Sequence, residues 1–228
     1  MANTIALRKQ YSTLLDEVYK LSSLTAVLDG PNELVKEGAN ANEILIPKLS
    51  MQGLADYNKS TGYVAGDVTL DYETKKCAYD RGRMFNVDAM DNIESAGIAF
   101  GRLSGEFLRT QVVPELDAYR LASYAQIPGV TTAKAALATG KEALAALRTA
   151  RGKIENAEAN LSTCYLFINP TVYGLIEDLD TTASKKAIEG FAGIIKVPSG
   201  RFYNKVKLNA SGAGGFTKDT GAVAMNFL

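Results

Sequence analysis

Two carboxylates near the middle of the 228-residue chain, Asp88 and Asp91, have the residue type and spacing of a chemically active pair. Side chains three positions apart would suit acid and base work or the binding of Mg²⁺. Asp91 is also followed by Glu94, and an Asp N-cap with Glu at the third helical position forms a capping box. Because capping accounts for Asp91 completely, we favour a helix start over a catalytic pair.

Two further clusters have the composition of phosphate sites. Arg81-Gly82-Arg83 would place two guanidinium groups around a glycine, which suits bidentate contacts with an anion. Ion pairs with carboxylates such as Asp80 or Glu73 are the favoured alternative. The stretch 211–215 is glycine-rich, but no Lys-Ser or Lys-Thr follows it and no strand-loop-helix setting surrounds it. We therefore interpret 211–215 as the tip of a surface loop.

The composition removes most enzyme classes from consideration. The chain contains no His, which excludes Ser-His and Cys-His dyads and the common zinc and non-haem iron ligand sets. Cys77 and Cys164 lie far apart without a CxxC partner, so we expect two small buried hydrophobic side chains. No catalytic, cofactor-binding or metal-ligating residue is therefore predicted, and an enzyme would have to use carboxylates, Lys or Tyr.

Charge and hydropathy limit the partners. Lys and Arg number 25, Asp and Glu number 25, and the isoelectric point near 6.4 is far from that of a dedicated nucleic-acid reader. A net charge of zero also removes the repulsion that keeps monomers apart. The sequence shows neither a signal peptide nor an apolar run of membrane-spanning length. We therefore expect a cytoplasmic protein that tends to associate.

The first part of the chain predicts two arms. Residues 4–22 carry apolar side chains at helical spacing, which predicts an amphipathic helix on a flexible arm. Residues 44–47 form a short strand whose Pro indicates an edge position. A polar tip at 51–66 separates this strand from 68–75, where apolar and polar residues alternate. Together these segments predict an extended hairpin that is wet on one face and needs an apolar partner on the other.

The centre of the chain predicts a long helix. Residues 77–87 look like further strand, and the capping box at Asp91 starts a helix of about thirty residues. Its apolar stripe changes phase at Pro114, where we expect a kink. The stripe consists of Ile93, Ala96, Phe100, Leu103 and Phe107 before the proline, and of Leu116, Tyr119 and Ser123 after it.

The last part predicts alternating helices and strands. Thr139 and Glu142 form a second capping box, which opens a helix with one apolar face. The run from Cys164 to Ile168 is continuously apolar, as expected of a buried central strand. Further helices through 170–179 and 183–190 and a strand at 193–197 complete the pattern of an α/β domain.

Two stretches make the sequence recognisable. Tyr79–Asp91 (YDRGRMFNVDAMD), followed by Val112–Arg120 (VVPELDAYR), resembles the major capsid protein of tailed phages and prophages with the Hong Kong 97 type fold. The resemblance runs in order through the chain and is looser toward the C-terminus. It implies an α+β fold with an N-terminal arm at 1–42, an extended β-hairpin loop at 43–76, a peripheral domain with a long spine helix at 77–130, and an α/β axial domain at 131–228.

The resemblance implies a structural role with no catalytic residue and no cofactor. Such proteins assemble in the cytoplasm of the bacterial host into hexamers and pentamers of the virion capsid, an icosahedral shell that encloses double-stranded DNA. For this chain we expect a scaffolding protein and a portal as partners, weak and sequence-independent contact with DNA, and no contact with a membrane. Candidate residues of the subunit interface are Tyr57, Tyr63, Tyr72, Arg81 and Arg83.

Two alternative functions stay open. An encapsulin-like compartment would share the fold but hold cargo enzymes instead of DNA. A carboxylate- or Lys-dependent enzyme belongs to another class, and only weak residue pairs favour it. Electron microscopy of purified protein separates all three, because closed particles exclude the enzyme and their contents distinguish the two shells.

The C-terminus departs from the pattern of the capsid family. Chains of that family normally continue past the equivalent of residues 222–228 and return to close the peripheral sheet. We therefore expect a truncated or shortened chain in which the strand at 221–228 has no partner and forms an apolar edge.

Overall fold

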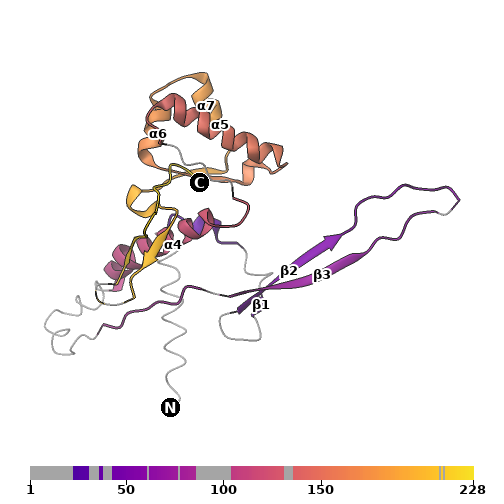
Figure 1. The fold of residues 1–228 in the computed structure, drawn as a ribbon, viewed down its shortest axis with the longest axis horizontal. Helices are drawn as coiled ribbons and strands as arrows, with labels where there is room; N and C mark the ends of the chain where they lie inside the picture. Colours follow the sequence, from indigo (N-terminus) through magenta and orange to yellow (C-terminus); the bar gives the residue numbers. More distant parts are fainter. Residues whose placement is uncertain are drawn as a thin grey trace, which may run out of the picture. The chain divides into compact units, whose positions relative to one another are not determined.

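The structure is a computed structural model that describes residues 23–30, 36–37, 43–60, 62–76, 78–85, 104–130, 136–210, 212 and 214–228. Contacts divide the chain into two compact units: residues 1–28 and 89–228 form unit 1, and residues 29–88 form unit 2. The described residues contain both α-helices and small β-sheets (Figure 1). The predicted mixture of α and β structure is therefore confirmed, whereas the predicted domain boundaries stay a prediction.

Unit 2 contains the predicted hairpin. Strand β2 (Glu43–Met51) pairs antiparallel with β3 (Val68–Lys76) along nine residues of each strand. The short strand β1 (Lys36–Glu37) pairs only with Leu45 and Ile44 on the other edge of β2. Among the described residues, Pro47 thus has a strand partner only in β3, which agrees with the edge position that its missing N–H requires.

The prediction of a strand at 77–87 is wrong for residues 78–85, which form no strand. Their apolar side chains are exposed, Met84 at 82% and Phe85 at 44%. A strand needs a ladder partner and a surface for its apolar face. No strand pairs with this segment among the described residues, so local sequence preference alone does not make it a strand.

The centre of unit 1 is strand β4 (Tyr165–Ile168). On one edge it pairs parallel with β5 (Gly193–Lys196). On the other edge Phe167 and Leu228 exchange two backbone hydrogen bonds, of 2.8 and 3.0 Å, and Ile168 forms an antiparallel bridge with Phe227. The predicted buried central strand is confirmed. The predicted unpaired edge at 221–228 is wrong, because these last residues return along β4 and hydrogen-bond to it.

The side chains of β4 alternate between two hydrophobic cores. Leu166 and Ile168 belong to the first core, and Phe167 belongs to the second. Successive strand residues point to opposite faces of a sheet, so four residues serve both cores. The other buried members of the first core are Ala143, Leu147, Val172, Ile176 and Ala187. Those of the second are Leu121, Val197 and Phe202.

Helices cover these cores where the sequence predicts them. Helix α5 (Gly140–Asn156) begins with the predicted capping box, in which Thr139 Oγ1 accepts from the Glu142 amide at 3.4 Å. The Glu142 carboxylate in turn accepts from the Thr139 amide at 3.2 Å. Asn169 caps α6 (Pro170–Glu177), which has Pro in its first turn, and Thr181 caps α7 (Thr182–Ile188). The remaining elements are η1 (Ala26–Leu28), η4 (Leu161–Thr163), η5 (Ser199–Arg201), β6 (Val206–Leu208) and β7 (Phe216–Lys218).

A π-helical turn lies directly before Pro114, at the place where the sequence predicts a kink. The chain is helical from residue 104, widens into η3 (Leu108–Val112) and continues as α4 (Val113–Ala125). Proline lacks the N–H of a regular helix and its ring crowds the carbonyl four residues earlier. A π turn directly before it leaves room for both. The part of the predicted stripe at 93–103 lies outside the described residues.

The buried face of α4 differs from the predicted stripe. The predicted residues are only half-buried: Leu116, Tyr119 and Ser123. Ala118 and Leu121 are instead fully buried, and so is Asp117. The spacing of apolar residues cannot predict a buried carboxylate such as Asp117. The hydrophobic pattern therefore predicted the wrong face of α4 to be buried.

Gly140 lies at a close contact between α5 and α6, which a substitution at this position can test. A Cβ at this position would lie 2.2 Å from the carbonyl oxygen of Leu175. We expect Gly140→Ala to destabilise unit 1 by about 1–3 kcal/mol, because the backbone of α6 must move. The control is Gly152→Ala in the same helix, where a Cβ would meet nothing within 4 Å. This control should stabilise by about 0.5–1 kcal/mol, and equal unfolding midpoints for the two variants in urea would contradict the contact.

Candidate assembly surface

The register of β2 and β3 creates one apolar face on the hairpin. Residues directly opposite each other in an antiparallel pair lie on the same face of the sheet. Leu49 lies opposite Leu70, Met51 opposite Val68, and Pro47 opposite Tyr72. We call these side chains the ribbon face: Pro47, Leu49, Met51, Val68, Leu70 and Tyr72.

The ribbon face is exposed in the single chain. Leu49 and Leu70 are 57% and 58% exposed, and Met51 and Val68 are 66% and 68% exposed. Full burial of such a side chain is worth about 1.5–3 kcal/mol. A two-stranded ribbon has no second layer to cover it, and in water such a ribbon is marginal by itself. The ribbon face therefore needs a surface beyond the two strands.

The opposite face of the same two strands is mostly polar. Lys48 lies opposite Asp71, and Ser50 opposite Thr69. Lys75 Nζ contacts Glu73 Oε1 at 2.5 Å, and both side chains are about half exposed. The hydrogen bond from Lys75, followed by its positive charge, lowers the pKa of Glu73 below its ordinary value. This carboxylate stays charged at neutral pH, which keeps this face in contact with water and gives the ribbon two distinct sides.

The tip of the hairpin presents two tyrosine rings together. Gln52 and Asp67 close its base, where the Gln52 amide donates to the Asp67 carbonyl at 3.2 Å. The ring centroids of Tyr57 and Tyr63 are 5.0 Å apart, and these residues are 60% and 90% exposed. Figure 1 draws this tip at the end of the β2–β3 ribbon. Rigid exposed aromatic rings are frequent anchors of protein interfaces.

The structure places the five predicted interface residues in three settings. Tyr57 and Tyr63 lie side by side at the tip, and Tyr72 lies on the ribbon face. Arg81 and Arg83 are exposed in the irregular segment 78–85.

The sequence prediction missed five residues of the ribbon face as site residues: Pro47, Leu49, Met51, Val68 and Leu70. In β3 the strict alternation already contained the signal. In β2 the apolar run at Ile44–Ile46 hides the alternation, and only the pairing register shows which residues share a face with β3.

The other chemical candidates are not strengthened. Asp88 and Asp91 lie outside the described residues. The glycine-rich stretch connects β6 to β7 as a hairpin, in which the Asn209 amide donates to the Gly215 carbonyl at 3.0 Å, so no helix N-terminus follows it. Among the described residues, no three His, Cys, Asp or Glu side chains cluster as metal ligands would, and no helix is long and apolar enough to cross a membrane.

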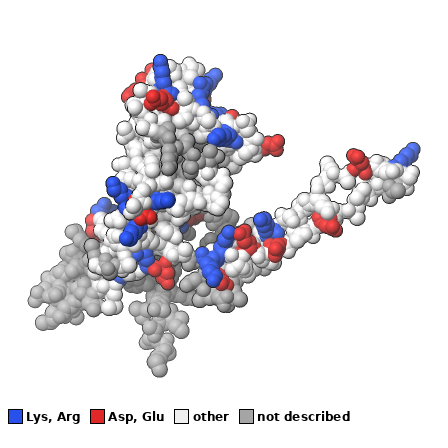
Figure 2. All heavy atoms as spheres, in the orientation of Figure 1, with Lys and Arg blue, Asp and Glu red and all other residues white. Residues whose placement is uncertain are grey.

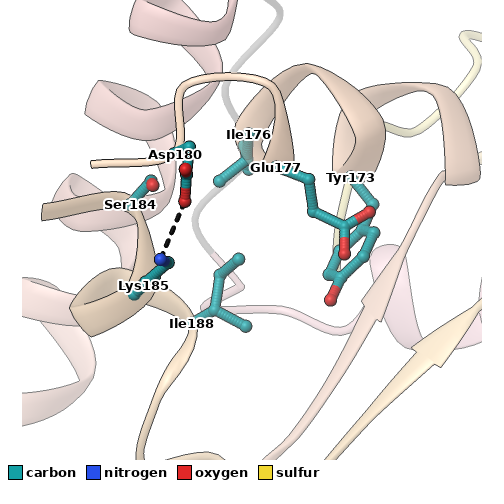
Figure 3. A pocket seen from close by; sticks show the side chains of 7 residues that line it. All are labelled: Tyr173, Ile176, Glu177, Asp180, Ser184, Lys185 and Ile188. Atoms are coloured by element: carbon teal, nitrogen blue, oxygen red, sulfur yellow. Dashed lines mark ion pairs between the residues drawn. The ribbon is translucent and has the colours of Figure 1, made fainter. Parts of the chain in front are cut away.

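Among the described residues, a hollow of about 360 Å³ between α6 and α7 is a further candidate for small-molecule chemistry (Figure 3). Asp180 and Lys185 form an ion pair of 2.7 Å beside it, which lowers the pKa of Asp180 and raises the pKa of Lys185. Burial, followed by a hydrogen bond with Glu177, raises the pKa of Tyr173. Each shift holds its group in the ordinary protonation state at neutral pH. Each of these shifts moves a pKa away from neutral pH, which is the opposite direction from the tuning of a general acid or base.

Charges of both signs are interspersed along unit 2. In Figure 2, Lys and Arg alternate with Asp and Glu along the ribbon, and uncharged surface dominates toward the tip. A surface that follows a nucleic-acid backbone would show a stripe of one sign. The face of the ribbon drawn in Figure 2 shows no such stripe.

No protein-family model, no curated protein and no solved structure matches the chain. The interpretation of the surface therefore rests on the geometry of the ribbon.

The exposure of the ribbon face can be measured in dilute subunits. We expect Leu70→Thr to change the free energy of unfolding by no more than about 0.5 kcal/mol, because the side chain is largely in water. Emission of a hydrophobic dye bound to the protein should fall, whereas Thr69→Ser on the polar face should leave it unchanged. A loss of about 2 kcal/mol or more would mean that the chain itself covers this face.

Proposed function

We propose that this chain is a structural shell protein of the phage major capsid type, which assembles with further copies of itself. The ribbon face is the observation that carries the proposal. It is long, apolar, exposed, and opposed to a polar face, so it suits contact with a neighbouring copy along one side only. The sequence resemblance through Tyr79–Asp91 and Val112–Arg120 supports the same function.

The proposed assembly is a repeated head-to-tail contact. The ribbon face of one copy covers an apolar surface of the next copy, and a contact between two different patches closes into a ring when its rotation permits. Hexamers and pentamers would be such rings, and together they would form the closed shell. The Tyr57–Tyr63 tip would add an aromatic anchor at the far end of each ribbon.

The proposal includes the contents and the place of the shell. It would enclose double-stranded DNA, with a portal and a scaffolding protein as further partners, and would form in the bacterial cytoplasm before it becomes the virion capsid. With 25 basic and 25 acidic residues, each copy neutralises few phosphates, so contact with DNA would be weak and independent of sequence.

Assembly of the purified protein tests this function directly. Concentrated wild-type protein should form uniform closed particles in electron micrographs and in light scattering. Leu49→Thr with Leu70→Thr should raise the concentration needed for assembly by about a hundredfold, because about 3 kcal/mol of burial is lost at each contact. Lys48→Ser, next to Leu49 in β2 but on the polar face, should assemble as wild type.

Three outcomes would contradict the proposal. Wild-type protein that stays monomeric at high concentration in the presence of its scaffolding partner would exclude a shell. Unimpaired assembly of the double variant would exclude the ribbon face. Particles isolated from cells with packaged enzymes instead of DNA would favour the encapsulin-like compartment.

Salt dependence tests the contact with DNA. Binding of the subunit to DNA fragments in a filter assay should be independent of their sequence and should disappear between about 50 and 200 mM salt, because released counterions drive it. A complex that selects one sequence and survives this salt range would contradict a shell lining.

A further inference from the structure

The carboxylate of Asp117 lies in the interior of unit 1 and is bound by a segment that is distant in the sequence. Asp117 is 0% exposed on α4. Its Oδ1 accepts from the hydroxyls of Ser23 at 2.5 Å and Thr25 at 2.8 Å, and from the Thr25 amide at 3.3 Å. Its Oδ2 accepts from the Leu24 amide at 3.2 Å and lies 3.6 Å from Nη1 of Arg201.

The segment that binds Asp117 is itself held tightly. Thr25 is 0% exposed, and its hydroxyl also accepts from Nη1 of Arg120 at 3.3 Å. Leu24 packs against the second hydrophobic core. The turn η1 follows at once, with the Leu28 amide donating to the Thr25 carbonyl at 3.0 Å. We call residues 23–28 the anchor segment.

A buried carboxylate fixes the register of the anchor segment more strictly than apolar packing would. Removing a charge from water is costly, and similar stability is available from apolar side chains. What the charge adds is a specific set of donors: two hydroxyls and two amides at successive positions of Ser23-Leu24-Thr25. A shift of this segment by one residue in either direction would put Leu24 or Ala26 at the place of Thr25, so the buried carboxylate would lose that hydroxyl donor and the shifted register would be less stable.

The anchor segment lies at the junction of both predicted arms. Residues 4–22, the predicted amphipathic helix, precede it in the sequence. Unit 1 ends at Leu28 in this part of the chain and unit 2, which carries the ribbon face, begins at Asp29. The contacts of Asp117 therefore hold the residues of unit 1 that come directly before unit 2 in the sequence.

We propose that Asp117 is a positioning residue for assembly, acting through Ser23 and Thr25 to fix the base of both arms. This inference rests on the proposed function, because it assigns to the anchor the placement of arms that contact neighbouring copies. Loss of the anchor should impair assembly far more than it impairs the fold of unit 1.

The experiment compares isosteric and conservative changes at Thr25. Thr25→Val keeps the shape of the side chain and removes the hydroxyl donor, whereas Thr25→Ser keeps the donor. We expect the fraction of particles to fall at least tenfold for Thr25→Val, measured well below its melting temperature, and to stay near wild type for Thr25→Ser. Asp117→Asn should lower the fraction of particles as Thr25→Val does. If Asp117→Asn does not fold, the comparison of Thr25→Val with Thr25→Ser tests the proposal.

A core variant separates positioning from stability. Val172→Ala removes a buried side chain of the first core, away from the anchor, and should lower the melting temperature while assembly persists. Equal loss of assembly in Val172→Ala and Thr25→Val, at equal melting temperature, would overturn the proposal. So would full assembly of Thr25→Val.

Trypsin digestion of dilute subunits tests the anchor segment independently of assembly. Cleavage after Lys20 should be at least tenfold faster in Thr25→Val than in wild type and unchanged in Val172→Ala. Unchanged cleavage in Thr25→Val would overturn the anchor itself. If wild-type protein never assembles, the proposed shell function and the proposed assembly role of Asp117 are both wrong. The digestion still tests whether Thr25 holds the anchor segment in place.

Discussion

Strand β4 is the element on which the rest of unit 1 depends. Both of its edges are hydrogen-bonded, by β5 and by the last residues of the chain, and its side chains enter both hydrophobic cores. Pairing on both edges and packing on both faces satisfy most of the backbone groups and apolar side chains of this strand within unit 1. The helices α5, α6 and α7 can therefore pack on one core while α4 contributes Leu121 to the other.

In the strands of unit 2, successive side chains also alternate between two faces, but only in unit 1 are both faces of the strand covered. The ribbon of unit 2 pairs the edges of β2 and β3 and keeps one polar face in water, but the side chains around Leu49 and Leu70 have no second layer in the ribbon. The same alternation that completes the core of unit 1 thus produces an unsatisfied face in unit 2. This contrast between a closed unit and an open ribbon is the physical basis of the proposed shell function.

The anchor segment directly precedes unit 2 in the sequence. The anchor segment is held by a buried charge and by Leu24 in the core, so its position in unit 1 does not depend on the ribbon. A contact with a neighbouring copy costs less free energy when its base is already ordered. The proposed role of Asp117 follows from this lower free-energy cost. The anchor segment is ordered when the chain folds, so it does not have to be ordered when a neighbouring copy binds.

Local patterns in the sequence determined the elements whose signals lie within a few residues. The Thr139–Glu142 capping box, the apolar run of β4 and the alternation in β3 were all predicted and are all present. Even the irregular turn before Pro114 follows from one residue that cannot donate a hydrogen bond. As to the candidate site, the sequence pointed to the hairpin and its three tyrosines.

Only the tertiary structure decided which faces are buried and which distant segments meet. It placed Asp117 inside because Ser23 and Thr25 bring donors from 92–94 residues away, and it paired Leu228 with Phe167. Within the described part of the chain, it formed no strand at 78–85. It also assembled the ribbon face from residues of two strands, through a register that neither strand encodes alone. Periodicity and caps are properties of one segment, whereas burial of a charge or the choice of a partner strand depends on the free energy of two segments together.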